Sequence, residues 1–158
     1  MAKIKLLKSY YNKETGESYI ALNTKYGIFE GYSKLHEEDK DIVSEYIGCN
    51  YAEVKAIIKY EKTKLINKQK KLKTIKILLN EMEKLNGYNK NSIEARYIRK
   101  QYYIVKKEVD EQILKIKYLK NSLYKAMNNY REEKDKFEEK IKKIREKRET
   151  SKNIKETK

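Results

Sequence analysis

The sequence lacks most of the residues that interrupt or cross-link a chain. It contains no proline and only five glycines in 158 residues, so little stands in the way of long helices. Its single cysteine, Cys49, cannot form an internal disulfide, which fits a reducing compartment. No apolar run has the length of a signal peptide or approaches the roughly 20 residues that span a bilayer. We therefore expect a cytoplasmic protein without a membrane-embedded segment.

Residues suited to catalysis are equally scarce. The only histidine, His36, stands beside four acidic residues within residues 37–41. Such a group could hold a divalent metal ion, as in a nuclease, but carboxylates also gather at helix N-termini because the dipole favours them there. Cys49 lies in no CxxC pair, and we find no Walker loop, Gly-rich dinucleotide turn or nucleophile elbow. We expect no enzyme, no cofactor and no metal, and retain a metal-dependent nuclease as a third hypothesis.

Positive charge is abundant, and it is unevenly distributed. The net charge is +15, with 39 basic and 24 acidic side chains. Residues 1–50 hold seven lysines and eight acids, a balance of −1, so residues 51–158 carry +16. Such one-sided charge points to a polyanionic partner. The alternative is that the lysines only keep long helices in solution.

Three short runs near the N-terminus have the β-branched and aromatic content of strands. They cover residues 3–11, 18–24 and 28–32. The turns Asn12–Gly16 and Lys25–Gly27 separate them, which predicts a small antiparallel sheet. A sheet of this size needs cover on one face.

Helical patterns follow the strands. A short helix is predicted over residues 39–47, ending at Gly48, and we expect it to cover the sheet. Asn50 and Glu53 then form a capping box, and no breaker occurs before residue 85. An apolar stripe along this second predicted helix has coiled-coil spacing. It comprises Val54, Ile58, Leu65, Leu72, Ile75, Leu79 and Met82, with Glu61 and Lys68 as polar members.

A second capping box, Asn91–Glu94, begins a helix predicted to reach about Arg148. The short connection makes the two helices antiparallel neighbours. Because the first helix covers the second only to about residue 128, we expect the remainder to bind a second copy or another protein. The apolar stripe comprises Ile116, Leu119, Leu123 and Met127, then the predicted oligomer seam of Tyr130, Phe137, Ile141 and Ile144.

These patterns predict an α+β fold that is mostly α, a small antiparallel sheet followed by a long helical hairpin. We expect a head over residues 1–50, the hairpin over residues 51–148 and a disordered tail over residues 149–158.

Two basic stretches with interleaved tyrosines are the predicted binding residues. Cationic side chains along a line suit phosphates, and exposed aromatic rings beside them can stack on unpaired bases. No helix-turn-helix, zinc finger or ribonucleoprotein motif accompanies them. The candidates are Lys55, Lys59, Lys62, Lys64, Lys70, Lys73, Arg96, Arg99, Lys100, Tyr103, Lys106 and Lys107.

Several segments together resemble small uncharacterised proteins of Firmicutes phages and prophages. They are Tyr26–Gly31, Leu35–Asp41, Gly48–Glu53, Ser92–Arg96 and Arg99–Gln101, and the likeness covers about residues 10–125. The resemblance implies a bacterial host cell and a host-takeover or anti-defence role, such as an anti-CRISPR protein. It supplies no catalytic residues.

The preferred hypothesis is a non-enzymatic binding protein. Its expected partner is a nucleic acid or a nucleic-acid-handling host complex, such as a defence nuclease, which it would inhibit. We also expect a homodimer and no membrane partner. The alternative is a structural or assembly protein in which the coiled coil is the working part and the positive charge is incidental.

Overall fold

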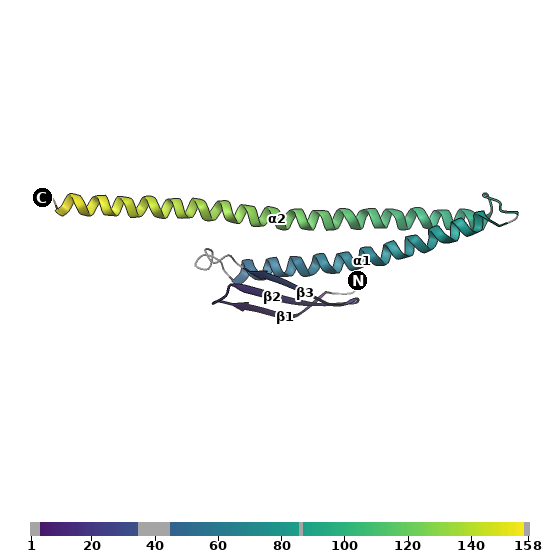
Figure 1. Ribbon diagram of the computed structural model, residues 1–158, viewed down its shortest axis with the longest axis horizontal. Helices are drawn as coiled ribbons and strands as arrows, with labels where there is room; N and C mark the ends of the chain where they lie inside the picture. The colour runs from purple at the N-terminus through teal and green to yellow at the C-terminus, as the bar shows by residue number, and fades with distance from the viewer. Residues whose placement is uncertain (1–3, 35–44, 86, 157–158) are drawn as a thin grey trace. The chain divides into compact units, whose positions relative to one another are not determined.

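The structure is a computed structural model that describes residues 4–34, 45–85 and 87–156 (Figure 1). Three strands precede two long helices, and strand order in the antiparallel sheet is β1-β2-β3. The predicted α+β, mostly α fold class is confirmed. The chain divides into two compact units, and the boundary between them falls between Lys120 and Asn121. The elements are β1 (Lys5–Asn12), β2 (Glu17–Thr24), β3 (Gly27–Lys34), α1 (Glu45–Glu83) and α2 (Ile93–Glu156).

Both predicted turns form through local side-chain hydrogen bonds. The Asn12 carboxamide oxygen accepts from the backbone N–H groups of Glu14 and Thr15, at 2.9 and 3.2 Å. In the second turn the Thr24 hydroxyl oxygen accepts from the N–H of Tyr26 at 3.1 Å. Gly27 has φ +113°, a conformation that residues with a Cβ rarely adopt. These turns fix the register of the three strands.

Close packing of α1 against the sheet forms the core. Ala52 and Ala56 are fully buried on α1, against Ile20 and Leu22 of β2. The approach is tightest at Gly31 of β3, where an added Cβ would lie 1.8 Å from the Ala52 carbonyl oxygen. Small side chains at the contact let the helix backbone reach the sheet, so larger residues there would push the helix away.

The helix that covers the sheet differs from the short helix that the sequence predicted. α1 is a single helix that runs through Gly48 and Asn50, so the predicted helix end and N-cap at these residues are wrong. Gly48 instead permits close packing, because a Cβ there would lie 2.2 Å from the Ser18 hydroxyl oxygen. The described part of the predicted helix over 39–47, residues 45–47, belongs to α1, and residues 39–44 lie outside the described residues.

Beyond the sheet, α1 packs antiparallel to α2 within the first unit. Glu61 contacts Gln112 and Lys115, whereas Lys68, one heptad later, contacts Glu108 and Gln112. The partner number falls as the α1 number rises, which is the signature of antiparallel packing. The predicted α1 seam from Ile58 to Met82 is buried or half-buried throughout. On α2 the seam begins earlier than predicted, with Ala95, Val105, Val109 and Gln112 buried before Ile116.

One layer of this seam is polar and charged. The Glu61 carboxylate, only 3% exposed, accepts hydrogen bonds from Gln112 at 2.5 Å and from Lys115 at 2.9 Å. It also forms an ion pair with Lys64 at 2.9 Å. Burial raises the pKa of Glu61, but the hydrogen bonds from Lys115, Lys64 and Gln112 outweigh it, and the pKa lies below its ordinary value. The buried carboxylate is therefore charged at neutral pH.

The N- and C-terminal ends of α2 differ from their predictions. Ser92, not Asn91, is the N-cap, since its hydroxyl oxygen accepts from the N–H of Ala95 at 3.2 Å. At the other end α2 continues to Glu156, past the predicted end near Arg148 and into the predicted disordered tail. The reason is compositional, because neither glycine nor proline follows Gly87. No described helix has the length and apolarity needed to cross a membrane.

Replacing Gly31 tests the close contact between α1 and β3. Gly31→Ala inserts a methyl group where the Ala52 carbonyl oxygen stands, and we expect a loss of about 1–3 kcal/mol in the free energy of unfolding. Urea unfolding followed by circular dichroism measures it. The control is Ile28→Ala on the same strand, where the side chain is 61% exposed. Equal stability of Gly31→Ala and the wild type would contradict the packing.

Replacing Glu61 tests the polar layer. The folded-state pKa is depressed, so the charge stabilises the fold above the unfolded value of about 4.3 and ceases to do so as pH falls through the folded value. We expect Glu61→Gln to be less stable at pH 7 by roughly 1–3 kcal/mol, and the difference to shrink in strong acid.

Glu81→Gln is the matched control, because Glu81 also pairs with a lysine three residues on but is exposed. Its unfolding free energy should change little at any pH. Urea unfolding at pH 7 and below pH 4 compares the three proteins. A constant difference between Glu61→Gln and the wild type across this range would show that the charge of Glu61 contributes nothing.

Candidate nucleic-acid interface

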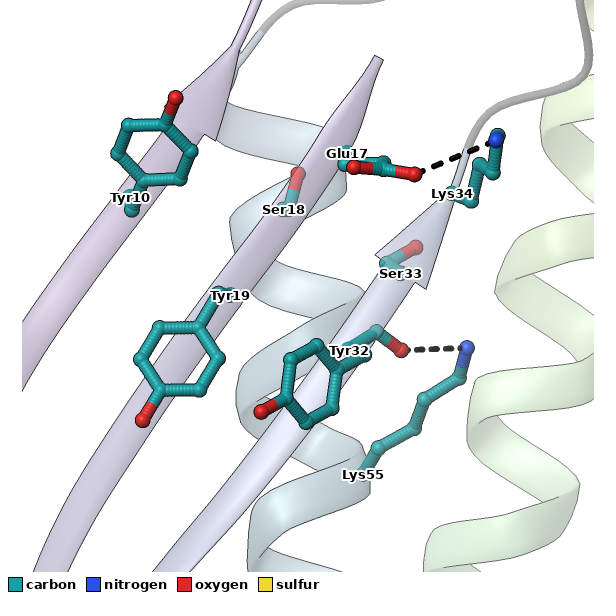
Figure 2. A pocket seen from close by; sticks show the side chains of 8 residues that line it. All are labelled: Tyr10, Glu17, Ser18, Tyr19, Tyr32, Ser33, Lys34 and Lys55. Carbon is teal, nitrogen blue, oxygen red and sulfur yellow. Dashed lines mark hydrogen bonds and ion pairs between the residues drawn. The ribbon is translucent and has the colours of Figure 1, made fainter. Parts of the chain in front are cut away.

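A row of tyrosines crosses the sheet on the face opposite α1. Tyr10 of β1 pairs with Tyr19 of β2, which pairs with Tyr32 of β3, so each strand contributes one ring at the same level. Tyr10 is 53% and Tyr32 57% exposed. Figure 2 shows the three rings on one side of the sheet, with the α1 ribbon behind it. We call these three residues the tyrosine row.

A shared carboxylate holds two rings of the tyrosine row in place. The hydroxyls of Tyr19 and Tyr32 donate to the two Glu30 carboxylate oxygens, at 2.8 and 3.3 Å. The ring centroids of Tyr19 and Tyr32 lie 4.9 Å apart. The hydrogen bond to Glu30 raises the pKa of Tyr19, and partial desolvation followed by the Glu30 charge raises that of Tyr32. Both hydroxyls therefore stay protonated well above neutral pH.

The tyrosine row lines an open depression of about 690 Å³. Its other walls come from the adjoining ends of β2 and β3 and from α1 (Figure 2). Glu17 and Lys34 form a cross-strand ion pair at 3.2 Å on this wall. Lys55 of α1 reaches around the β3 edge to the same depression. An aromatic surface and a cationic side chain thus meet in one place.

Two predicted binding residues bond to the open edge of β3. The ammonium group of Lys55 donates to the backbone carbonyl of Tyr32 at 2.9 Å, and that of Lys59 donates to the carbonyl of Glu30 at 2.6 Å. Lys59 also lies 5.9 Å from the centroid of the Tyr32 ring. These contacts satisfy edge carbonyls that would otherwise be available to another strand.

The two lysines begin a longer line of charge on α1. The lysines of this line follow one another at steps of three, four or eight residues. Such steps place them along one side of the helix, away from the seam with α2. Lys59, Lys62, Lys70 and Lys73 are exposed and Lys55 is half-buried. In the described residues none of the five pairs with a carboxylate. We define the lysine line as Lys55, Lys59, Lys62, Lys70 and Lys73. The sixth α1 candidate, Lys64, lies apart from it, bound to Glu61 and over the Tyr60 ring.

The α2 candidates divide into two groups. Arg96 and Arg99 hold the connection between the helices, donating to the backbone carbonyls of Asn91 and Lys90 at 2.8 and 2.9 Å. Arg99 also bonds to the Tyr88 hydroxyl. The second group points into solvent and comprises Lys100, Tyr103, Lys106 and Lys107. Arg96 and Arg99 thus have structural contacts that the sequence did not reveal.

The predicted oligomer seam lies in the second unit. Phe137 and Ile144 are each 52% exposed, while Tyr130 and Ile141 are half-buried. Phe137 and Ile144 are one heptad apart on one helix face.

Of the residues considered for catalysis, Cys49 lies in the described part of the chain. Cys49 is half-buried against the core of Ile20 and Leu22, and its sulfur accepts from the Ser9 hydroxyl at 3.6 Å. His36 and its acidic neighbours lie outside the described residues, so the nuclease hypothesis stays a prediction. Among the residues described, no group of three or more His, Cys, Asp and Glu side chains is arranged to hold a metal ion.

Comparisons with protein-family models, with curated proteins and with solved structures find no match to this chain. The arrangement of its own side chains therefore carries the argument about function.

Proposed function

We propose that this protein binds nucleic acid without catalysing a reaction on it, and that the lysine line is the phosphate-binding surface. The observation that carries the proposal is that five lysines follow one side of α1 from the β3 edge outward, and none of them pairs with a carboxylate among the described residues. From Lys55 to Lys73 the line extends about 27 Å at 1.5 Å per residue. A line of cations of this length is able to meet several consecutive phosphates and release their counterions.

The local charge supports a polyanion over a neutral partner. Residues 62–76 contain seven lysines and no acidic residue. Only two of the seven, Lys64 and Lys68, have internal partners in the described structure. The remaining five repel one another, and a bound polyanion would relieve that repulsion.

The alternative, an assembly protein working through its coiled coil, has less support from the first unit. The α1 seam packs against α2 of the same chain, with Val105, Val109 and Ile116 buried. What remains for assembly is the second unit, where Phe137 and Ile144 are exposed. We therefore propose that the protein is a homodimer joined there and that assembly accompanies nucleic-acid binding.

The role in an infected cell remains a prediction from the resemblance to phage proteins. An anti-defence factor acting in the cytoplasm on a host nuclease would use a nucleic-acid-mimicking or nucleic-acid-binding contact. The lysine line suits the second of these, since its positive charge is complementary to the phosphates of a nucleic acid and opposite in sign to that of a nucleic-acid mimic.

Neutralising part of the lysine line tests the proposed function. In Lys62→Gln/Lys70→Gln/Lys73→Gln the net charge falls from +15 to +12. We expect weaker binding to a labelled oligonucleotide and a log K against log salt slope shallower by about 2, from three lost contacts at roughly 0.7 each. Fluorescence anisotropy across a salt series measures both quantities.

A matched variant separates position from total charge. Lys136→Gln/Lys140→Gln/Lys143→Gln removes the same charge from exposed positions on the second unit. Its affinity and salt slope should stay near those of the wild type. Equal losses in both triple variants would mean that charge acts only in bulk, and absence of wild-type binding at low salt would overturn the proposal.

The homodimer has its own test. Phe137→Ser/Ile144→Ser removes two exposed apolar side chains one heptad apart, and we expect the mass measured by light scattering to fall from that of two chains to that of one. Lys140→Ser, an exposed change on the same helix, should leave the mass unchanged. A wild-type protein that is monomeric at high concentration would contradict the dimer.

A further inference from the structure

The tyrosine row and the lysine line meet at the β3 edge and form one continuous surface. Lys55 lines the same depression as the three rings. Lys59, its neighbour one turn along α1, holds its ammonium group 5.9 Å from the centroid of the Tyr32 ring. A chain of phosphates bound along the line would therefore arrive at the aromatic face of the sheet.

The arrangement of the rings exceeds what sheet stability requires. Cross-strand aromatic pairs stabilise antiparallel sheets, and this accounts for the contact between Tyr19 and Tyr32. It does not account for Tyr10, which extends the row to β1 with half its surface in solvent. Neighbouring strands lie about 4.8 Å apart, so the row offers ring positions at short, regular intervals.

The rings are also ordered before any ligand arrives. Glu30 holds the hydroxyls of Tyr19 and Tyr32 with one oxygen each, and so limits rotation of both side chains. A ring that is already fixed loses less conformational entropy when a flat ligand stacks on it. The carboxylate, engaged by both hydroxyls, is a weaker source of repulsion to a nearby phosphate than a free one.

The ligand chemistry follows from this combination. Bases inside a duplex are stacked on each other and present only their edges, whereas unpaired bases expose flat faces to aromatic side chains. We infer that the tyrosine row stacks unpaired nucleobases and that the ligand is a single-stranded nucleic acid whose backbone follows the lysine line. This inference rests on the proposed function and adds its substrate class.

An anisotropy titration with paired probes tests the inference. The probes are a thymidine oligonucleotide about 16 nucleotides long, an abasic phosphodiester strand of equal length, the matching duplex and a uridine oligonucleotide. We expect the wild type to bind the thymidine strand at least about tenfold more tightly than the abasic strand, from stacking on several rings. The uridine probe separates RNA from DNA as the source of the bases.

Variants identify the rings responsible. In Tyr10→Leu/Tyr32→Leu the preference for the thymidine strand over the abasic strand should disappear, while affinity for the abasic strand is kept. Tyr10→Phe/Tyr32→Phe should restore the preference, because phenylalanine keeps the ring. The control Tyr118→Leu/Tyr124→Leu removes two tyrosines that are 71% and 69% exposed on α2 and should leave the preference intact.

The outcomes separate this inference from the proposed function. Equal binding of the thymidine and abasic strands by the wild type overturns base stacking but leaves phosphate binding by the lysine line standing. A preference that survives in the leucine variant places the stacking elsewhere and overturns the role of the row. No binding of any probe overturns both.

Discussion

The rest of the structure depends on how closely α1 approaches the sheet. With Gly31 on β3 and fully buried Ala52 and Ala56 on α1, backbone packs on backbone, with no space for a further methyl group. This contact sets the rotation and height of a helix of 39 residues against eight-residue strands. Because α1 is rigid, the same contact decides where Lys55 and Lys59 lie and which side of the helix faces α2. A shift of one residue at Ala52 would rotate α1 by about 100° and separate the lysine line from the tyrosine row.

Two sides of α1 make different contacts, and the sequence pattern along the helix reflects this. Small residues face the sheet and the seven-residue repeat faces α2. The lysine line continues near the sheet-facing side beyond the sheet, since Lys70 follows Ala52 by about five full turns. The charged layer around Glu61 lies where α1 leaves the sheet and its packing passes to α2. A fully apolar layer would bury more surface, but Glu61 fixes Gln112 and Lys115 of α2 at one level of α1 through directed bonds. Such a layer favours one alignment of the helices over neighbouring ones.

The sequence predicted the strands and the long helices because local chemistry decides both. Asn12 and Gly27 form their turns with nearby atoms, and absence of proline leaves the helices uninterrupted. Gly48 and Asn50 misled the prediction, since a glycine that permits close packing looks like one that ends a helix. The lysine line could be predicted from helical spacing alone. The tyrosine row could not, because Tyr10, Tyr19 and Tyr32 become neighbours only through the register of two turns. Alternation along each strand was the available signal, and it requires the turn lengths to be known first.

Lys55 and Lys59 bond to backbone carbonyls at the β3 edge and still have N–H donors left for a ligand. An ammonium group has three N–H donors, and each of Lys55 and Lys59 uses one for an edge carbonyl. That bond holds the long side chain in one position, so the entropy of ordering it is lost on folding and not on binding. The remaining donors stay available to phosphate oxygens. A residue that shields a strand edge from aggregation would thereby also be held in place for the phosphate contact that we propose. This accounts for lysine, with its three donors and flexible stem, at both positions: arginine's planar guanidinium would less easily bond a backbone carbonyl and a phosphate that lie in different directions.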